Sequence, residues 1–520
     1  MKRIFRLSFL AAIFGIAISD IANAQVEPNI QQERQYGDVP QTIIVAGKID
    51  NHDQSQQLTL DVNRIGFMQE QILAKIDSAG NFIAIFESYI PVDVWVSYRT
   101  NFLVLLHPGD SLFVHFDGQK GNRPALLNSI SFGGDAAQTN QYAAKFQQMY
   151  YFNELYRNVD RHNRAVKENE PAQYLLYMDT IQQKFMEIYD QFIVEHNPND
   201  ESKKWARLYI ENDYYRKLSQ YASNHKRANN MEWDNPWDVP KGFYDVLCNR
   251  LPIDSSMFIN AEGLFSFHNS FEHRYVFEKL IDRKTDGVRH MPGGRYVVLT
   301  KHNLDSLKIF SIIEFVPDPL LLQIILTAKF SMELEFGQNI RNYEKFHDVV
   351  DKYIKEPFLK EPLHQKYLQT KHRIENPQVY TEAILKEAAN LSVSKIMDDI
   401  LQQNKGKVIY VDFWGTWCGP CLMEMPNSKI IEHKFKDKDV VCLYICLESE
   451  EKQWKATLDQ FQLGGQHYLL SRQQSGEMRK LFEITGVPFY MLIDKNGVIK
   501  EKGSHLRPLF VQDKIKEMLK

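Results

Sequence analysis

A chain of 520 residues is too long for one compact core, so we expect about two to four domains. Hydrophobic residues make up 44% of the sequence and the formal net charge is -4, which is typical of a water-soluble protein. The charge balance argues against a nucleic-acid-binding protein. The lack of an apolar run of roughly 20 residues argues against a multispan membrane protein.

Residues 1–24 have the pattern of a secretory signal peptide. Basic residues at positions 2, 3 and 6 precede an apolar stretch over residues 7–18, and small residues follow at 22–24. The stretch is too short to span a membrane stably, and no cysteine follows it to carry a lipid. We expect removal of residues 1–24 and export without stable membrane insertion, into the periplasm if the cell is Gram-negative. An ordinary buried helix is the alternative.

Residues 38–120 are predicted to form an all-β domain. Short alternating apolar runs between Thr42 and Asp117 are separated by turn-forming segments such as 78–81 and 108–110. Runs of this length and spacing are typical of an antiparallel β-sandwich of about seven strands.

Residues 134–376 are predicted to form a mostly α-helical domain. Apolar residues recur every three or four positions, as in the series Ile181, Phe185, Ile188 and Phe192. Polar segments at 196–202 and 229–241 separate the predicted helices, and Pro317-Asp318-Pro319 precedes another. Such stripes usually form core. A ligand cleft, or a contact surface around Trp233 and Trp237, is the alternative.

Residues 379–520 alternate between β and α patterns. A helix near residues 396–401 precedes an apolar run at 408–413, and a second apolar run follows at 440–447. The end is a predicted hairpin around Asn496-Gly497 and a closing helix over 507–520. We expect an α/β domain with a mixed sheet of four or five strands.

The cysteines of the CGPC motif, Cys418 and Cys421, carry the predicted chemistry. The motif stands where the apolar run gives way to a helical pattern, which places Cys418 at a helix N-terminus. Unpaired N–H groups and the helix dipole stabilise an anion there, and the pKa of a thiol can fall from about 8.5 to roughly 7 or below. The motif therefore indicates dithiol/disulfide exchange, with Cys418-Cys421 as the redox-active disulfide.

The other three cysteines are expected to be buried apolar residues. Cys442 and Cys446 lie on a predicted strand that separates them by about 13 Å, whereas a disulfide needs Cα atoms within about 7 Å. Cys248 stands alone. The order of the last four cysteines comes close to a zinc-ribbon spacing, but the strand holds two of them too far apart. We expect no metal and no cofactor.

The last 140 residues or so resemble a thioredoxin-fold domain. The residues that carry the resemblance are Asp412, six positions before Cys418, then Trp417, Gly419, Pro420 and the loop Thr485-Gly486-Val487-Pro488. Glu424-Met425-Pro426 and the long middle segment 448–470 resemble the exported TlpA-like disulfide reductases in particular.

The whole layout is similar to that of TlpA-like proteins of Bacteroidetes: a signal peptide, a small β module, a helical region and the thioredoxin-like domain. TlpA-like domains usually open with a hairpin that carries a Gly-Lys pair. Here a helical stretch precedes Lys405-Gly406-Lys407, as in thioredoxin itself.

The predicted mechanism has two steps. Cys418, expected to be exposed, attacks a substrate disulfide as a thiolate, and Cys421 then attacks the mixed disulfide and releases the reduced substrate. Cys421 must lose a proton for the second step. Asp412, at the end of a buried strand, is the first candidate to accept it, and Glu424 is the second. A structural role for Asp412 and a solvated position for Glu424 are the alternatives.

The resemblance implies further roles. Trp417, Gly419 and Pro420 support the active site, and Val487-Pro488 corresponds to the family's cis-proline loop, which presents backbone to an extended substrate strand. An ordinary trans proline is the alternative.

The expected direction of electron flow is reduction of the substrate. Gly419-Pro420 resembles thioredoxin, whose potential is about -270 mV, whereas strong oxidants lie near about -120 mV. The resemblance implies a membrane electron donor and exported protein substrates with disulfides, including cytochrome c precursors. A thiol oxidase or isomerase is one alternative. A scaffold protein, in which the residues before Val379 act and the thioredoxin-like domain is accessory, is another.

Overall fold

The computed structural model describes residues 38–520 except 232–234, 282–287, 292–294 and 299–300. The predicted signal peptide and Trp233 lie outside the described residues. The chain divides into two compact units. The first contains the described residues up to Ala328 together with Asp351–Lys360, and the second contains Lys329–Val350 and Glu361–Lys520. None of the described helices is both long and apolar enough to cross a membrane.

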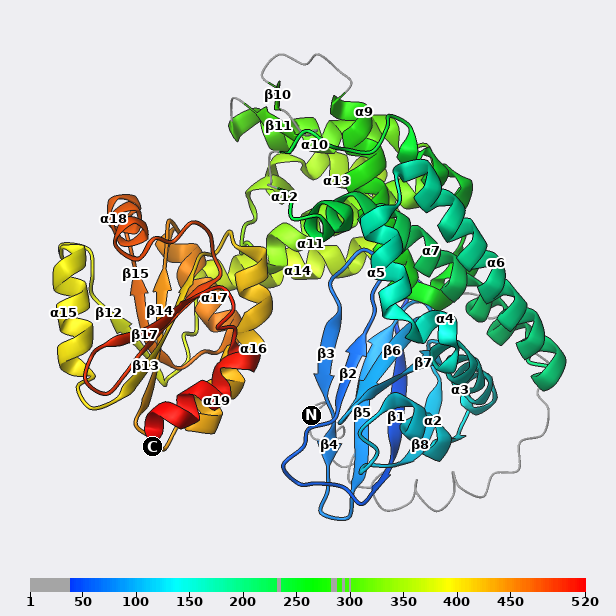
Figure 1. Ribbon diagram of the computed structural model, residues 1–520, viewed down its shortest axis with the longest axis horizontal. Coiled ribbons are helices and arrows are strands. Elements are labelled where there is room, and N and C mark those ends of the chain that lie inside the picture. The colour runs from blue at the N-terminus through cyan, green and yellow to red at the C-terminus, as the bar shows by residue number, and fades with distance from the viewer. Residues whose placement is uncertain (1–37, 232–234, 282–287, 292–294, 299–300) are drawn as a thin grey trace, which may run out of the picture. The chain divides into compact units, whose positions relative to one another are not determined.

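The N-terminal part of the first unit is built from two β-sheets (Figure 1). Their strand orders are β4-β5-β1-β8-β9 and β3-β2-β6-β7. Alternate residues of both sheets, such as Val45 and Val94, are buried in one shared hydrophobic cluster. The strands are β1 (Gln41–Asp50), β2 (Thr59–Val62), β3 (Glu70–Leu73), β4 (Lys75–Ile76), β5 (Asn81–Ser88), β6 (Val92–Ser97), β7 (Asn101–Leu106), β8 (Ser111–Asp117) and β9 (Ser131–Gly133).

The prediction of a purely antiparallel arrangement is wrong for one pair of strands. β1 pairs with β8 in parallel, with Ile44 beside Ser111 and Asp50 beside Asp117. The strands β2–β7 intervene along the chain, so no hairpin forces β8 to run against β1. The alternation of apolar residues determines which face of a strand is buried, and it leaves the partner and the direction open.

Helices dominate the chain between Arg123 and Glu375, as predicted. The predicted core residues are buried in an aromatic-rich cluster with Phe146 and Trp205: Ile181, Phe185, Ile188 and Phe192. The helices are α2 (Arg123–Ser129), α3 (Ala137–Phe152), α4 (Glu154–Arg157), α5 (Val159–Glu168), α6 (Pro171–His196), α7 (Asp200–Ala228), η1 (Phe243–Arg250), η2 (Ser255–Asn260), α8 (Ala261–Ser270), η3 (Phe271–Val276), α9 (Phe277–Ile281), α10 (Lys301–Phe315), α11 (Pro319–Glu335), α12 (Arg341–Lys345), α13 (His347–Tyr353) and α14 (Pro357–Glu375). A hairpin of β10 (Val288–Met291) and β11 (Arg295–Val298) interrupts them.

One predicted loop feature differs in detail from the structure, and Trp237 is packed rather than part of a contact surface. The polar segment 196–202 is shorter than expected, because the side chain of Asn199 accepts a hydrogen bond from the Ser202 N–H and starts α7 at Asp200. Trp237 stacks on His225 with ring centroids 4.1 Å apart, so this tryptophan is a packing residue.

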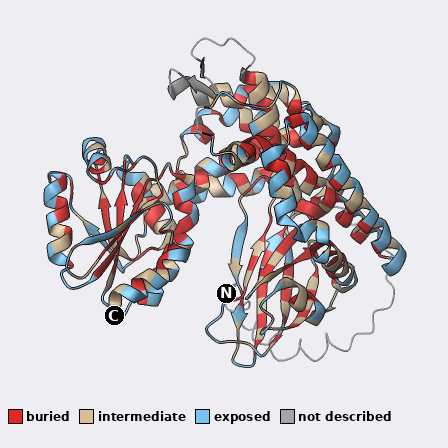
Figure 2. Cartoon of the chain, viewed as in Figure 1, coloured by how far each residue is buried: buried red, intermediate tan, exposed pale blue. Residues whose placement is uncertain are grey.

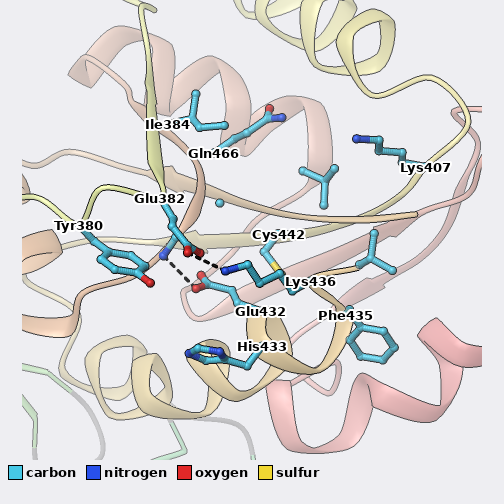
Figure 3. Close-up of a pocket in the computed structure, with 14 residues that line it drawn as sticks. Tyr380, Glu382, Ile384, Lys407, Glu432, His433, Phe435, Lys436, Cys442 and Gln466 are labelled. Atoms are coloured by element: carbon cyan, nitrogen blue, oxygen red, sulfur yellow. Dashed lines mark hydrogen bonds and ion pairs between the residues drawn. The ribbon is translucent and has the colours of Figure 1, made fainter. Parts of the chain in front are cut away.

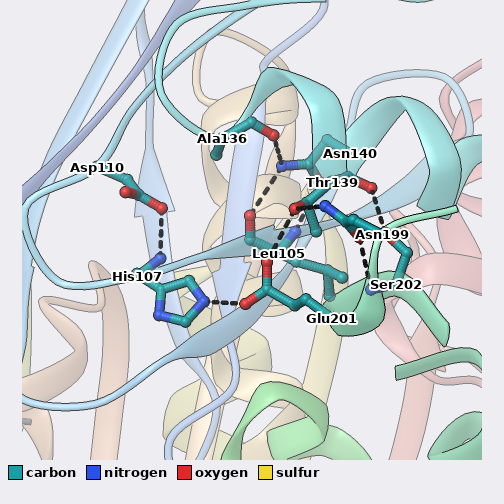
Figure 4. A network of polar contacts seen from close by, with 9 residues as sticks. All are labelled: Leu105, His107, Asp110, Ala136, Thr139, Asn140, Asn199, Glu201 and Ser202. Atoms are coloured by element: carbon teal, nitrogen blue, oxygen red, sulfur yellow. Dashed lines mark hydrogen bonds and ion pairs between the residues drawn. The ribbon is translucent and has the colours of Figure 1, made fainter. Parts of the chain in front are cut away.

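Helix α3 covers the free edge of β7. Asn140 accepts a hydrogen bond from the Leu105 N–H at 2.7 Å and donates one to the Leu105 carbonyl at 2.8 Å (Figure 4). Gln147, on the same face of the helix, makes the same pair of bonds to Leu103. Two side-chain amides thereby satisfy backbone groups that an edge strand leaves unpaired.

The same helix contributes to a polar network with the start of α7 (Figure 4). Glu201 accepts from the Thr139 hydroxyl at 2.8 Å and is paired with His107, which follows β7. Asn199 donates to the same hydroxyl at 2.9 Å. The network ties the end of β7, α3 and α7 together within the first unit.

The second unit is organised around a six-stranded sheet with the order β12-β15-β14-β13-β16-β17. Its strands are β12 (Ala383–Lys386), β13 (Val408–Trp414), β14 (Val440–Cys446), β15 (Gly465–Leu469), β16 (Phe489–Ile493) and β17 (Ile499–Gly503). Its helices are α15 (Val393–Gln403), α16 (Gly419–Phe435), α17 (Glu451–Phe461), α18 (Arg472–Phe482) and α19 (Pro508–Leu519). Every residue of β13 is buried, and Figure 2 shows the buried residues along the central strands.

The expected four or five strands are too few because β12 and β15 lack a strong β pattern. β12 has only four residues at the edge of the sheet, and β15 includes the polar residues Gln466 and His467. His467 is nevertheless fully buried and stacks on Tyr444 at 4.7 Å. The predicted helix before the first core strand is confirmed as α15, and the predicted hairpin is confirmed as the antiparallel pair β16–β17.

Candidate active site

The CGPC motif lies at the start of α16, directly after β13. Cys418 and Cys421 form a disulfide with a Cα–Cα distance of 5.3 Å. Cys418 is the N-cap residue of α16, and its sulfur accepts a hydrogen bond from the backbone N–H of Cys421 at 3.2 Å. The sulfur therefore takes the place of the side-chain oxygen that usually caps a helix, at the positive end of the dipole.

The expectation that Cys418 is exposed is wrong for the disulfide form. Cys418 is 4% exposed and Cys421 is 1% exposed, and both belong to the hydrophobic cluster that contains Trp414 and Met425. The cap position turns the Cys418 sulfur back over the first turn of the helix. Pro420 and Trp417 are exposed, so the residues next to the cysteines reach the surface while the cysteines do not.

Trp417 anchors the segment between β13 and the disulfide. Its indole N–H donates to the Leu447 carbonyl at 3.1 Å, and its ring lies 6.0 Å from the Arg479 guanidinium. A Cβ atom at Gly415 would lie 2.7 Å from this ring and 3.1 Å from the Leu447 carbonyl oxygen. The close approach of the ring thus requires glycine at 415, a residue that the sequence analysis did not single out.

Asp412 lies in β13, on the face of the sheet that packs against α16. Its strand neighbours on that face, Tyr410 and Trp414, belong to the same cluster as both cysteines. Asp412 is 1% exposed, and its Oδ1 atom has no hydrogen-bond partner among the described residues. Burial, and then the nearby charge of Glu424, raise the pKa of Asp412 well above its ordinary value. The predicted buried carboxyl is confirmed in position; its role stays a prediction.

Glu424 is largely buried, so the alternative of a solvated helix acid is wrong. Its Oε1 atom accepts from Nη1 of Arg507 at 2.9 Å, and its Oε2 atom accepts from Nδ2 of Asn427 at 3.0 Å. Arg507 is the residue immediately before α19. No local pattern pointed to Arg507, because it is 83 positions away from Glu424 along the chain.

The Val487–Pro488 peptide bond is cis, which confirms the expected isomer. Val487 is partly buried and packs against the cluster that contains Cys418 and Cys421. The predicted substrate-binding role of this loop stays a prediction.

The remaining cysteines are free thiols. Cys442 and Cys446 are buried, as expected. Burial raises the pKa of the Cys442 thiol far above its usual range and that of Cys446 to about 12, so neither is a thiolate at neutral pH. Cys248 is half-buried, so the prediction of full burial is wrong there. It lies in the short helix η1, beside Tyr275.

A separate pocket of about 240 Å³ lies at the other end of the parallel strands, where β14 and β15 begin (Figure 3). It is lined by residues at the beginnings of β14 and β15, including Cys442 and Gly465, whereas the disulfide follows the end of the parallel strand β13. Glu432 in this pocket accepts from the Tyr444 hydroxyl at 2.5 Å and the Gly464 N–H at 2.9 Å, and burial raises its pKa. The pocket is not part of the disulfide site.

Comparisons with known proteins agree with this geometry. A family model described as thioredoxin-like matches residues 406–499. The thiol-disulfide oxidoreductase ResA of Bacillus cereus is 30% identical over 149 residues, which are 28% of this chain and 80% of that protein. ResA of Bacillus thuringiensis is 32% identical over 126 residues, which are 24% of this chain and 71% of that protein.

Solved structures include the thioredoxin domain of a thiol-disulfide oxidoreductase from Bacteroides vulgatus. It is 26% identical, with a TM-score of 0.22, and the match covers 23% of this chain and 84% of that one. On the strength of the ResA relatives, this chain belongs to the thioredoxin-like family of thiol-disulfide oxidoreductases and is a protein-disulfide redox enzyme.

Proposed function

We propose that this enzyme is exported and reduces the disulfides of other exported proteins through Cys418 and Cys421. The observation that carries the proposal is the hydrogen bond from the Cys421 N–H to the Cys418 sulfur at a helix N-terminus. In the reduced enzyme this environment stabilises a Cys418 thiolate, which is the attacking form of the residue.

The proposed cycle transfers two electrons from the enzyme dithiol to the substrate disulfide. The Cys418 thiolate attacks one sulfur of the substrate disulfide, and the other substrate sulfur leaves as a thiolate. The Cys421 thiol gives its proton to Asp412 and attacks the Cys418 sulfur, which releases the second substrate sulfur. The substrate gains two electrons from the two enzyme sulfurs and becomes a dithiol with two protons, one passed on from Cys421 by Asp412 and one from water. The enzyme is left with the Cys418–Cys421 disulfide. A membrane electron donor must return the two electrons.

The proposed direction rests on Gly419 and Pro420, which match the dipeptide of thioredoxin. The test is the reduction potential of the full chain, measured by equilibration with glutathione or dithiothreitol buffers. We expect a value near about -270 mV, and a value above about -150 mV would make the enzyme an oxidase.

Substrates and the electron donor are identified by trapping. Cys421→Ser lacks the resolving sulfur, so mixed disulfides should accumulate on Cys418 and can be isolated from the exported fraction of the native cell. We expect exported proteins with disulfides among the partners, with cytochrome c precursors as candidates. Cys418→Ala is the matched control and should trap none. A cell that tolerates Cys418→Ala but not loss of the whole protein would instead support the scaffold function.

The proposal includes export after removal of the signal peptide, residues 1–24. The mature chain should begin near Gln25, which N-terminal sequencing of the native protein tests.

The proposal also assigns the regions before the catalytic domain. The two N-terminal sheets, which bury one shared cluster, support assignment of residues 38–120 to a β-sandwich domain. Residues 134–376 and 379–520 are the proposed helical and catalytic domains.

A further inference from the structure

The turn that follows β14, residues 447–449, supports the segment that leads into the disulfide. The Trp417 indole N–H donates to the Leu447 carbonyl at 3.1 Å, and the Thr416 N–H donates to the Ser449 hydroxyl at 3.0 Å. The same hydroxyl donates to the Leu447 carbonyl at 3.0 Å. The turn therefore fixes the two residues that directly precede the first cysteine.

Helix α18 braces this turn at two points. The Glu448 N–H donates to the Ser475 hydroxyl at 3.1 Å, and the Glu448 carboxylate pairs with Nε of Arg479 at 3.3 Å. Glu448 has a φ of 51°, a backbone conformation that is strained for a residue with a side chain and persists only when its surroundings hold it. Ser475 is fully buried, so α18 determines where the turn stands.

Arg479 also contacts Trp417 directly. Its guanidinium carbon lies over the indole ring, 6.0 Å from the ring centre, where a cation is attracted by the π electrons of the ring. The arginine side chain is 21% exposed, whereas Trp417 is 51% exposed. The tryptophan is therefore held in place while about half of its surface stays accessible.

The main chain of Arg479 begins the connection to the cis-proline loop. Its carbonyl accepts hydrogen bonds from the N–H groups of Glu483 and Ile484, the second at 2.9 Å. The loop 485–488 follows directly. One residue thus contacts Trp417 through its side chain and supports the entry to the cis-proline loop through its backbone.

We propose that Arg479 is a positioning residue for polypeptide substrates: it fixes Trp417 relative to the loop Val487-Pro488, so that these two surfaces receive one extended strand of the substrate. The inference deepens the proposed function and rests on it, because the substrate-binding role of Val487-Pro488 belongs to that proposal. Arg479 acts through Trp417 and does not act on the sulfurs in this role.

The physical reason is preorganisation of the substrate site. A bound strand gains from two surfaces only if both are in place, because ordering a mobile surface during binding costs free energy. A small disulfide has no flanking peptide and does not need both surfaces. The expected signature of Arg479 is therefore a preference for a peptide disulfide over a small one.

The test compares two disulfides that have the same leaving group. One is a peptide of about seven residues, roughly 20 Å long when extended, whose central cysteine carries thionitrobenzoate. The other is N-acetylcysteine amide with the same group. With either substrate the enzyme dithiol is oxidised to the Cys418–Cys421 disulfide, and one cysteine thiol and one thionitrobenzoate are released.

Reduced full-length enzyme is mixed with each substrate at increasing concentrations, and the release of thionitrobenzoate is followed in a single turnover. All variants carry Cys248→Ser, which removes a half-buried free thiol. The second-order rate constant for the peptide divided by that for the amide is the peptide preference.

We expect Arg479→Gln to lower the peptide preference by about three- to ten-fold, with the rate constant for the amide within about two-fold of the parent. The loss should come from a higher half-saturating concentration of the peptide. Glu448→Gln should act in the same direction but less strongly, because it leaves Arg479 over the Trp417 ring. Arg479→Lys keeps the charge without the planar group and should restore the preference only in part.

Two further variants show whether the effect passes through Trp417. In a Trp417→Ala background, Arg479→Gln should change the peptide preference little, because the ring is gone. Lys480→Gln removes an exposed charge from the next position of α18 and should leave both rate constants unchanged. The inference is overturned if Arg479→Gln keeps the parent preference, slows both substrates equally, or lowers the preference by the same factor without Trp417.

The parent enzyme separates this inference from the proposed function. If the parent itself shows no preference for the peptide, the substrate-binding role of Val487-Pro488 fails, and the inference fails with it. If the parent shows the preference and Arg479→Gln retains it, only the role of Arg479 fails.

Discussion

The backbone N–H of Cys421 points at the sulfur of Cys418 at a distance of 3.2 Å. Cys418 thus occupies the N-cap position of α16, where the first N–H groups of a helix have no backbone acceptor. On reduction, the sulfur at this position inherits both the hydrogen bond and the dipole. The attacking residue is therefore defined by its place at the helix terminus.

The ionisation of Cys418 can be measured in the reduced Cys421→Ser variant. Alkylation with iodoacetamide across a pH series, followed by mass spectrometry, should give an apparent pKa of roughly 7 or below. Cys442 and Cys446 provide internal controls, because their burial should prevent alkylation in the folded chain. A Cys418 thiol that stays protonated beyond about pH 9 contradicts the proposed mechanism.

The pH dependence of stability should report the buried carboxyl of Asp412. Its folded pKa lies above the unfolded value, so between the two values the folded state binds more protons than the unfolded state. The free energy of unfolding of the second unit should fall as the pH rises from about 4 through the folded pKa, by about 1.4 kcal/mol for each unit of difference.

Asp412→Asn removes the carboxyl group that causes this loss of stability. The stability of the variant relative to the parent should therefore increase with pH. Calorimetry of the oxidised protein at about pH 5, 7 and 9 measures the difference. The control is Asp513→Asn: Lys516 lowers the pKa of the exposed Asp513, so this carboxylate is ionised in both states over the range. A constant difference between Asp412→Asn and the parent would refute the expectation.

Gly415→Ala should displace the Trp417 ring, because the new Cβ would lie 2.7 Å from it. We expect a loss of about 1 to 3 kcal/mol in stability and a several-fold loss of reductase activity. In a Trp417→Ala background the ring is gone, so the same substitution should cost less. Equal costs in the two backgrounds would show that the ring contact is not the cause. Gly476→Ala, in α18 with open space around it, is a matched control that should be neutral or slightly stabilising.

Asn140→Ala should expose the edge of β7 in the first unit. It leaves the buried N–H and carbonyl of Leu105 without their side-chain partners, which costs at least about 2 kcal/mol. Hydrogen exchange of the peptide 101–106 should become at least about 10-fold faster. Gln148→Ala, which removes an exposed hydrogen bond of the same helix, should leave this exchange unchanged. Unaltered protection in Asn140→Ala would mean that the strand edge does not depend on α3.

The sequence alone determined the reaction type and the local framework of the site. A CxxC motif between an apolar run and a helical pattern defines a capped sulfur through interactions within a few residues, and Asp412 follows from its place in a fully apolar strand. These inferences hold because helix dipoles, capping and strand alternation act over short stretches of chain.

Tertiary structure decided the features that join distant segments. The parallel pairing of β1 with β8, the two additional strands β12 and β15, and the burial of Cys418 depend on which surfaces meet, and apolar periodicity does not encode the partner. The pairing of Arg507 with Glu424 is of the same kind, since a surface-type arginine becomes part of the site only when α19 packs against α16. Folding brings together two charged side chains that are 83 positions apart in the sequence, and the distance between them in space then decides how strongly they attract each other.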